Sequence, residues 1–470
     1  MPAVHPSPFS GSWYPDAAAD LERLLEERFQ ESCRRTGPFL FADGLGFVVP
    51  HAGPAYSGTV AAAVYRSIGQ QQPERIVLLA FPHHGGLRGV AAPDVETIST
   101  PFGAVPIYGD WPGGFVRLPE ERVCDHSFEI QLPFLQKAAP KAKVTPLYVG
   151  SMGADERREA AGRLAAAWRP GVAFVASSDF THYGRSFGYV PFPADSAVSV
   201  RLHELDHECI DAAGSLDSAL FLDALEERSA TVCGTGPIAL LLDVMRRLPV
   251  EGIYQATLDY QASGELTRDY RHSVSYAALG YFPRSAFDLA AEDCGVLLDV
   301  AEETLLRVRQ TGERRPAPAR RGSAALQARR GAFVSLHQGE ELLGCVGNCA
   351  GRQPLAEEIG DLTLAAALED PRFRPATEVQ GPIDLEISVL TPFRRIRDIG
   401  EFSVGRHGAV LRMRGHSGLL LPQVAEDRGW TAEDFFRALA RKSMLGPQAW
   451  RDPKVRLEIF EAQVFARPGR

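Results

Sequence analysis

Four short, continuously apolar segments in the first part of the chain constrain its fold more than any other feature. They are rich in β-branched residues and read GFVVP (46–50), RIVLLA (75–80), VTPLYVG (144–150) and VAFVASS (172–178). Strands that are apolar on both faces are typical of a parallel sheet covered by helices on each side. Helix-like stretches, such as residues 156–168, separate the segments. The sequence therefore predicts an α/β domain with a mostly parallel central sheet and helices on both faces.

A second domain is expected after residue 284. The chain has 470 residues, which is more than a single hydrophobic core usually serves. Residues 1–284 carry 24 Lys and Arg against 33 Asp and Glu, whereas residues 285–470 carry 26 of each. Beyond an Arg- and Pro-rich loop at 309–331, strand-like and helix-like segments are mixed. We therefore expect domains at 1–284 and 285–470, the second an α+β domain that contains this loop.

Composition excludes several classes of protein. No apolar run approaches the roughly 20 residues that are needed to span a bilayer. The N-terminus lacks a charged segment followed by an apolar one, so we expect no secretory signal. The seven cysteines lack the spacing of a disulfide scaffold, and neither half has the basic excess of a general nucleic-acid binder. These features favour a cytoplasmic protein without membrane contact.

Histidines follow three of the four apolar segments. FVVPHAG ends in His51, IVLLAFPHHGG contains His83 and His84, and AFVASSDFTHYG contains Asp179 and His182. The carboxyl ends of parallel strands lie along one edge of a sheet, so these side chains should converge there. Successive residues of an extended backbone point to opposite faces, so we expect one residue of the histidine pair to bind a ligand and the other to support it.

Two further segments supply groups for the same site. CDHSFEIQLPF (124–134) brings His126, Glu129 and Gln131 close together. TVCGTGPIALLL (231–242) places Cys233 just before a predicted helix, where a cysteine tends to have a lowered pKa. Imidazole and thiolate are ligands of Fe, Cu and Zn, and two histidines with one anionic ligand leave positions open for substrate or water. The sequence therefore predicts a metal site at this sheet edge.

In order and spacing, seven motifs of the first half resemble the Memo family over residues 5–283. They are GSWYP, PHAGPAYSG, PHHGG, DHSFEIQLPF, SSDFTHYG, TVCGTGP and SVSYAALGYF. Memo proteins share their fold with the class III extradiol dioxygenases, which hold non-haem iron with two histidines and a glutamate. The resemblance implies that His51, His83 and Cys233 bind a metal. Fe(II) is the expected ion, and Cu or Zn is the alternative because a thiolate replaces the carboxylate.

The same resemblance implies roles for the other residues of the site. His182, with Asp179 beside it, falls where the dioxygenases keep their acid/base histidine, and His126 is expected as a further catalytic residue of the pocket. His84 and Glu129 are expected to support the metal ligands or to face the substrate.

The second half resembles the AMMECR-type domain over residues 288–465. The motifs include ELLGCVGNCAG, DLEISVLTPF, LLPQVAEDRGW and LARKSMLGPQAW. The family's hallmark Leu-Arg-Gly-Cys-Ile-Gly keeps Gly344, Cys345 and Gly347 here, while Leu343 replaces the arginine. Cys349 adds a CxxxC spacing. Both families, together with a radical S-adenosylmethionine enzyme, make up the AmmeMemoRadiSam system, so the resemblance implies that enzyme as a partner.

Three hypotheses about function follow, and they leave open whether the protein is an enzyme. The first is a redox-active, dioxygenase-like metalloprotein. The second is a non-catalytic metal- or peptide-binding module that acts with a radical enzyme or with RNA, whose phosphates would contact the arginines at 314, 315, 320, 321, 329 and 330. The third is a nucleophilic Cys233 or Cys345 activated by a nearby histidine.

Overall fold

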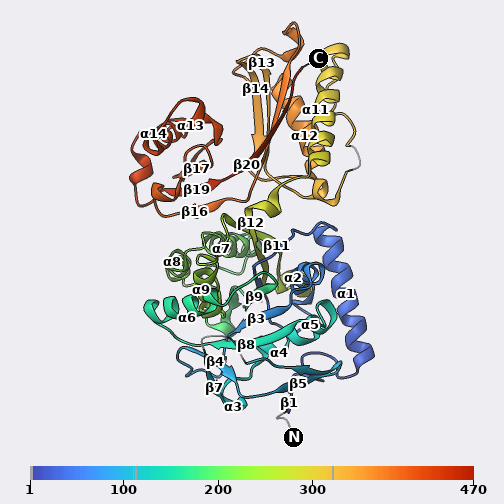
Figure 1. The fold of residues 1–470 in the computed structure, drawn as a ribbon, viewed down its shortest axis with the longest axis vertical. Helices are drawn as coiled ribbons and strands as arrows, with labels where there is room; N and C mark the ends of the chain where they lie inside the picture. Colours follow the sequence, from blue (N-terminus) through green and yellow to red (C-terminus); the bar gives the residue numbers. More distant parts are fainter. Residues whose placement is uncertain (1–3, 110, 112–113, 320–321, 470) are drawn as a thin grey trace. The chain divides into compact units, whose positions relative to one another are not determined.

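The structure of the protein is a computed structural model that describes residues 4–109, 111, 114–319 and 322–469. The chain divides into two compact units. The first unit comprises residues 1–36 and 40–286, and the second comprises residues 37–39 and 287–470. Figure 1 shows the elements of both units along the chain. The division between residues 286 and 287 lies beside the boundary predicted at 284/285.

The first unit is built on a nine-stranded sheet with the order β10-β12-β2-β9-β3-β8-β4-β7, and β11 pairs with β12. The strands are β2 (Gly46–Val49), β3 (Arg75–Ala80), β4 (Val90–Pro93), β7 (Val116–Leu118), β8 (Lys143–Val149), β9 (Val172–Ser177), β10 (His182–Gly184), β11 (Ile253–Ala262) and β12 (His272–Pro283). The four central strands β2, β9, β3 and β8 are parallel, as are β4 and β7. The pairs β12–β2, β10–β12, β11–β12 and β4–β8 are antiparallel. The sheet is therefore mixed, with its parallel part limited to the centre and one edge pair.

The parallel centre consists of the four apolar segments that the sequence predicted as strands. Every residue of β2, β3 and β9 is buried. Helices cover the sheet on both sides, with α1, α2 and α5 on one side and α6, α8 and α9 on the other (Figure 1). The continuous apolar character of the strands follows from this double cover, because neither strand face meets water.

The helices of the first unit connect the strands. They are α1 (Ala18–Thr36), α2 (Gly58–Gln71), α3 (Glu120–Val123), α4 (His126–Glu129), α5 (Gln131–Ala138), α6 (Ala154–Ala166), α7 (Val198–Ala213), α8 (Ser218–Arg228), α9 (Thr235–Met245) and α10 (Ser263–Thr267). α2 packs on β2, β11 and β12, and α9 packs on β2, β3, β8 and β9. A separate small sheet, with the order β1-β5-β6, is formed by β1 (Val4–Pro6), β5 (Thr97–Thr100) and β6 (Gly103–Pro106).

The second unit contains two four-stranded antiparallel sheets, which fits the α+β class. The first sheet has the order β14-β13-β15-β20 and comprises β13 (Ala332–Gln338), β14 (Glu341–Asn348), β15 (Asp384–Leu390) and β20 (Ala462–Arg467). The second has the order β16-β19-β17-β18 and comprises β16 (Arg394–Ile396), β17 (Gly408–Met413), β18 (His416–Leu420) and β19 (Arg456–Phe460). The helices are α11 (Ala291–Thr311), α12 (Leu355–Leu368), α13 (Gln423–Asp427) and α14 (Ala432–Lys442). α12 packs on β13 and β14, and α14 packs on β17 and β18.

Across the described ranges, no helix combines the length and the apolar character that a membrane span requires.

Candidate functional site

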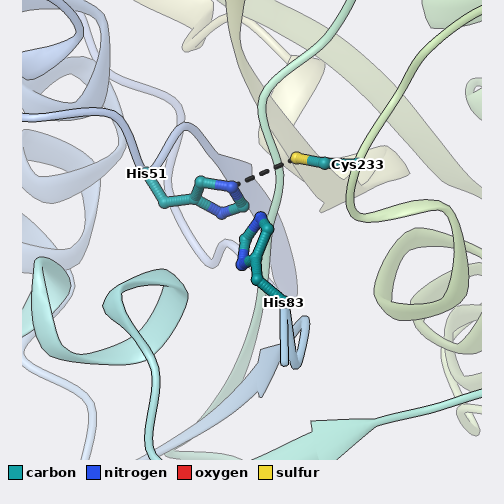
Figure 2. A group of neighbouring side chains, drawn as sticks. All are labelled: His51, His83 and Cys233. Atoms are coloured by element: carbon teal, nitrogen blue, oxygen red, sulfur yellow. Dashed lines mark hydrogen bonds between the residues drawn. The ribbon is translucent and has the colours of Figure 1, made fainter. Parts of the chain in front are cut away.

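The carboxyl ends of the central parallel strands gather the histidines, as the sequence predicted. His51 lies two residues after β2 and His83 lies three residues after β3, while Cys233 approaches from the segment before α9. One potential ligand atom from each of these three residues lies within 4.8 Å of the other two. Figure 2 shows the two imidazoles and the thiol facing one another. They are 182 residues apart at most, and the strand order β2-β9-β3 together with the segment before α9 brings them close to one another.

The His51 side chain is buried and held in one orientation. Its Nδ1 lies 3.0 Å from Ser177 Oγ at the end of β9, and its Nε2 lies 3.1 Å from Cys233 Sγ. Ser177 donates its own hydroxyl proton to the carbonyl of Ser127, so its oxygen accepts the Nδ1 proton of His51. The lone pair of His51 is therefore on Nε2 and is directed toward the thiol.

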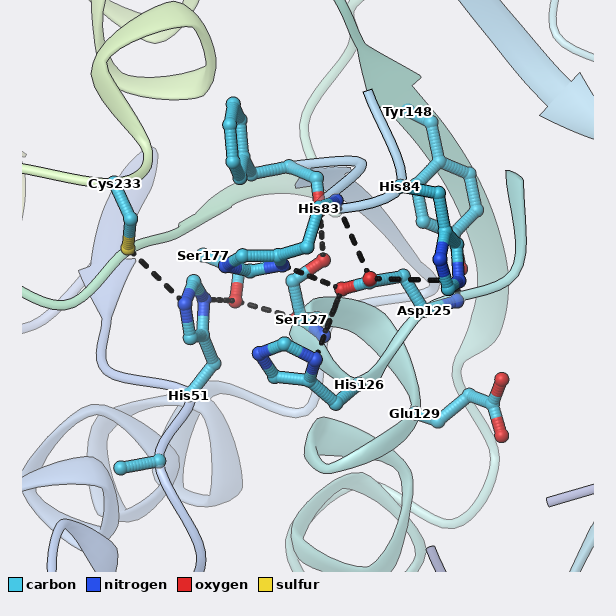
Figure 3. Close-up of polar contacts among 12 residues, drawn as sticks. His51, His83, His84, Asp125, His126, Ser127, Glu129, Tyr148, Ser177 and Cys233 are labelled. Carbon is cyan, nitrogen blue, oxygen red and sulfur yellow. Dashed lines mark hydrogen bonds and ion pairs between the residues drawn. The ribbon is translucent and has the colours of Figure 1, made fainter. Parts of the chain in front are cut away.

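Asp125 holds the second histidine from the opposite side of the site. Its Oδ1 lies 2.8 Å from His83 Nδ1 and accepts the backbone N–H of Ser127, while its Oδ2 accepts the backbone N–H of His83. Burial of Asp125 opposes its ionisation, but the hydrogen bond from His83, the charge of His126 and the N–H of Ser127 outweigh it and lower its pKa to about 2. Asp125 therefore carries a negative charge at neutral pH and leaves His83 Nε2 free to bind (Figure 3).

His126 lies among the candidate ligands. Its ring stacks on that of His83 with centroids 4.1 Å apart, and its centroid lies 5.3 Å from that of His51. Its Nδ1 lies 3.3 Å from Asp125 Oδ1. Burial lowers the pKa of His126 to about 4, although the Asp125 charge acts against this. His126 is therefore neutral at pH 7 and is itself part of a ligand group with His83 and Asp125.

The predicted acid/base residues have separate positions. His182 is half-buried and its Nδ1 lies 2.9 Å from the Phe180 carbonyl and 3.0 Å from that of Thr231, so Nδ1 carries the proton and Nε2 is the basic atom. Asp179 is buried, and its Oδ1 accepts the backbone N–H groups of His51 and Ala52. Burial raises the pKa of Asp179 to about 6, against the influence of His182. These hydrogen bonds anchor the His51 loop to Asp179, whose catalytic role stays a prediction.

The structure differs from the sequence-based expectations for Cys233 and bears on those for Glu129. A lowered pKa was expected for Cys233, yet burial and the charge of Asp179 raise it and outweigh the backbone N–H groups of Asp179 and Gly234, which act to lower it. Glu129 was expected to support the metal ligands or to face the substrate. Its carboxylate points away from the metal ligands (Figure 3), and its Oε1 lies 3.0 Å from His5 Nε2.

His84 has the more peripheral position of the histidine pair. Its side chain is 62% exposed, and its Nε2 lies 3.9 Å from Asp125 Oδ2. It therefore contacts the outer side of the carboxylate that holds His83, and it is free to contact solvent or a bound molecule. Gln131 is fully buried and donates from Nε2 to the Pro50 carbonyl, which supports the loop that carries His51.

Sequence reasoning missed Asp125 and Ser177, which orient both candidate ligands. Asp125 directly precedes His126 and caps α4 by accepting the Ser127 N–H. An Asp placed before a short helix is an N-cap signal that was present in DHSFE. Ser177 belongs to the serine pair that ends β9. A metal-binding histidine usually donates its second ring N–H to an oxygen, and this requirement was the available signal for both residues.

The glycines of the second-unit motif are explained by packing on β14. A Cβ on Gly344 would lie 2.2 Å from the Ala366 carbonyl oxygen, and one on Gly347 would lie 2.2 Å from the Phe333 ring. Cys345 accepts a hydrogen bond from Ser335 Oγ at 3.3 Å. None of the candidate ligand groups found within the described ranges includes Cys345 or Cys349. The small residues therefore allow close contact between β14, α12 and β13.

Asp370 supports the same motif and leads to a pH-dependent prediction. It accepts the backbone N–H of Cys345 at 2.9 Å and a two-pronged hydrogen bond from Arg372. The Arg372 hydrogen bond, with the Cys345 N–H, lowers the pKa of this carboxyl to about 2 although burial opposes it. Asp370 is 4% exposed, so its ionised form stabilises the folded state above the unfolded pKa near 4, and this contribution is lost as the pH falls through about 2.

Replacement of Asp370 by Asn should therefore lower the free energy of unfolding of the second unit by about 1–2 kcal/mol at pH 7, a value reduced because Arg372 is half-exposed. The difference from the wild type should disappear near pH 2. Hydrogen exchange of peptides from residues 332–390 measures this difference in stability between the variant and the wild type. A difference of the same size at both pH values would contradict this assignment of the charge.

The arginines predicted to contact phosphates are in different environments. Arg314, Arg315 and Arg329 are exposed, whereas Arg330 is buried and donates to the Leu390 carbonyl. Arg330 is therefore a structural residue, which corrects its place in the predicted RNA-binding set. Arg320 and Arg321 lie outside the described residues. Residues 309–311, the first three of the predicted loop, form the end of helix α11.

Comparisons with known proteins agree with this division of the chain. The family model described as Memo-like protein matches residues 6–280, and the AMMECR1 model matches residues 298–465. A MEMO1 family protein of Methanosarcina acetivorans is 33% identical over 288 residues, covering 57% of this chain and 96% of its own length. Protein MEMO1 of Danio rerio is 30% identical, covering 57% of this chain and 94% of its own. An uncharacterised protein from Pyrococcus horikoshii of solved structure is 30% identical and covers 36% of this chain and 89% of its own, with a TM-score of 0.35.

Proposed function

The chain belongs to the Memo-like protein family and carries an AMMECR1 domain behind the Memo-like one, and from this premise we propose that its first unit binds one transition-metal ion through His51, His83 and Cys233. The convergence of two oriented imidazoles and one thiol supports this proposal. Both Nδ1 atoms are engaged by protein oxygens, and the potential ligand atoms lie within 4.8 Å of one another. Histidine ligands of metals characteristically have their second nitrogen held in this way.

The donor set fits a first-row transition metal. Two imidazoles and a thiolate are borderline-to-soft ligands, which suit Fe(II), Cu and Zn and disfavour Mg or Ca. We propose Fe(II) as the native ion because of the family's relation to the extradiol dioxygenases, with Cu or Zn as the alternatives that a thiolate favours. When bound, such an ion would supply Lewis-acid and one-electron redox chemistry to a substrate beside it.

The residues around the donor set have defined tasks in this proposal. His182 offers a basic Nε2 and would accept or return a proton. His126, neutral and stacked on His83, would hold the ligand ring in place or complete the ligand set. Asp179 fixes the His51 loop through two backbone N–H groups. The protein would thus act as a redox-active, dioxygenase-like metalloprotein in the cytoplasm.

Metal analysis after purification without oxygen tests the proposal. The variant with His51, His83 and Cys233 all replaced by Ala should contain about one metal ion per chain less than the wild type, because no strong donor set remains at this edge. Cys209→Ala is a matched control, since Cys209 is a buried thiol of the same unit on α7. A triple variant that retains the full metal content would overturn the assignment. Oxygen uptake with phenolic compounds then tests redox activity, which His182→Gln should reduce without loss of metal.

A metal-free cysteine nucleophile is the second candidate, because Cys233 Sγ lies 3.1 Å from His51 Nε2. Alkylation at neutral pH followed by mass spectrometry distinguishes the two. Rapid labelling of Cys233 in metal-free protein would favour the nucleophile. Slow labelling is the result we expect, because burial raises the pKa of Cys233 and lowers that of His51.

We also propose that the protein acts in the AmmeMemoRadiSam system with a radical S-adenosylmethionine enzyme. The support is the presence of both the Memo-like and the AMMECR1 domain in one chain. Co-expression with the radical enzyme, followed by affinity purification of this chain, tests the partnership. Failure to retain the enzyme at low salt and under anaerobic conditions would contradict it.

A further inference from the structure

A second cluster of ligand-type side chains lies on the other side of the segment that carries Asp125 and His126. It consists of His5 on β1, Cys124 after α3 and Glu129 at the end of α4, and one potential ligand atom of each lies within 4.8 Å of the others. Figure 3 shows the Glu129 carboxylate pointing away from His51, His83 and Cys233. The cluster is therefore distinct from the centre described above.

Glu129 is the member of this cluster that lacks a complete set of partners. The residue is 0% exposed, and its Oε1 lies 3.0 Å from His5 Nε2. Its Oε2 is also buried and has no hydrogen-bond partner in the part of the chain that the structure describes. An unsatisfied buried carboxylate oxygen is costly, and a bound cation would remove that cost.

His5 is oriented as metal-binding histidines commonly are. Its Nδ1 lies 3.1 Å from Glu120 Oε2, while its Nε2 faces Glu129, and its side chain is only 13% exposed. A carboxylate that accepts the second ring proton of a histidine fixes the ring and strengthens it as a ligand. Glu120 is placed to do this for His5.

Cys124 supplies the third donor. It is buried, and burial together with the charges of Glu129 and Glu120 raises the pKa of its thiol. Among the described residues, the side-chain hydrogen bonds and ion pairs of His5, Glu120 and Glu129 involve no Lys or Arg. The cluster therefore combines anionic and neutral donors in a confined space where a divalent cation would be stabilised.

We propose that His5 Nε2, Cys124 Sγ and the Glu129 carboxylate form a second metal site that is selective for Zn²⁺. Nitrogen, sulfur and oxygen donors of this kind suit zinc, and one thiolate with one carboxylate balances its charge. The fourth position is available to water or to the second oxygen of Glu129. The ion would tie β1 to α4, and it would thereby brace the Asp125–His126 segment that serves the first centre.

Binding at this site releases protons, since the thiol of Cys124 and the proton that His5 shares with the carboxylates must leave. The affinity should therefore fall as the pH is lowered from 8 to 6. An ion pair alone, between an imidazolium and Glu129, would bind no metal at either pH.

Titration of the reduced, metal-free full-length chain with Co²⁺ tests the proposal through the thiolate-to-metal absorption. The wild type should bind one ion more than Cys124→Ser, which keeps the His5–Glu129 contact but removes the sulfur donor. Cys233→Ser should lose the ion of the first centre instead, and Cys209→Ser should match the wild type. Loss in Cys124→Ser therefore reports on the second site whether or not the first centre binds metal.

Zinc competition completes the experiment. Zn²⁺ should displace Co²⁺ from the second site, and Cys124→Ser should weaken binding there at least 100-fold. Equal binding by Cys124→Ser and the wild type would overturn the proposal and leave His5 as an ion-pair partner only. If Cys124→Ser folds poorly by circular dichroism, His5→Gln at the partly exposed rim replaces it, with the same two outcomes.

Discussion

Replacement of Asp125 by alanine should both destabilise the first unit and weaken the metal binding that we propose for it. The carboxylate is 2% exposed and serves His83 Nδ1, the backbone N–H of His83 and the backbone N–H of Ser127. Its removal leaves the N–H of the fully buried Ser127 unpaired and deprives the partly exposed His83 of its acceptor, for which we expect a loss of about 1–3 kcal/mol in the free energy of unfolding. It also releases the His83 ring, and the loss of a residue that orients a metal ligand typically costs about 10–100-fold in affinity.

Urea denaturation and metal titration of the same preparations measure both effects. Asp125→Asn is the matched control, since it keeps one oxygen for the Oδ1 contacts but loses the charge and the acceptor for the His83 backbone N–H. Its losses should fall between those of the wild type and the alanine variant. An alanine variant within threefold of wild-type metal affinity would show that Asp125 does not orient a ligand.

Replacement of Gly234 by alanine should disrupt the site by crowding. An added Cβ would lie 2.4 Å from Ser178 Cβ and 2.6 Å from the Ser177 carbonyl oxygen. The backbone of Gly234 has φ −84°, which any residue adopts, so space and not conformation requires glycine here. The displaced segment carries Cys233, whose Sγ lies 3.1 Å from His51 Nε2. We expect a loss of about 1–3 kcal/mol in stability from overpacking and a strong loss of metal affinity.

Gly236→Ala is the matched control in the same helix. A Cβ there would lie 3.5 Å from Val149 Cγ1, which is ordinary van der Waals contact. Because alanine favours helix over glycine by up to about 1 kcal/mol, this variant should be neutral or slightly more stable. Thermal unfolding and metal titration of both variants decide the question. Similar behaviour of the two alanine variants would contradict the argument from crowding.

The fold of the first unit could be predicted from the sequence mainly at its centre. The segments that became β2, β3, β8 and β9 were predicted within about one residue at each end, because apolar character on both faces marks a strand that is covered twice. The antiparallel strands β11 and β12 were not predicted. Their segments, 253–262 and 272–283, lack the short, uniformly apolar pattern, and pairing between strands is decided by contacts distant in sequence.

The candidate metal ligands could be predicted from the sequence, but the residues that orient them could not. Histidines at strand ends converge by the geometry of a parallel sheet, so the sequence alone was enough to pair His51 with His83. The orientation of each ring depends on Ser177 and Asp125, whose hydrogen bonds form only when β9 and α4 are packed in place. The two ends of α4 also belong to different clusters. His126, its first residue, lies with His83 and Asp125, whereas Glu129, its last residue, lies with His5 and Cys124.

The sequence by itself determined which side chains are candidate metal ligands and which sheet edge they occupy, because strand period and apolar pattern are local properties of the chain. The tertiary structure alone decided the protonation and partners of those side chains. Burial raises the pKa of Cys233 and lowers that of His51, and the same burial leaves Glu129 Oε2 without a partner among the described residues. Electrostatic and hydrogen-bond energies depend on distance and on exclusion of water, and both are fixed only when segments more than 100 residues apart are packed together.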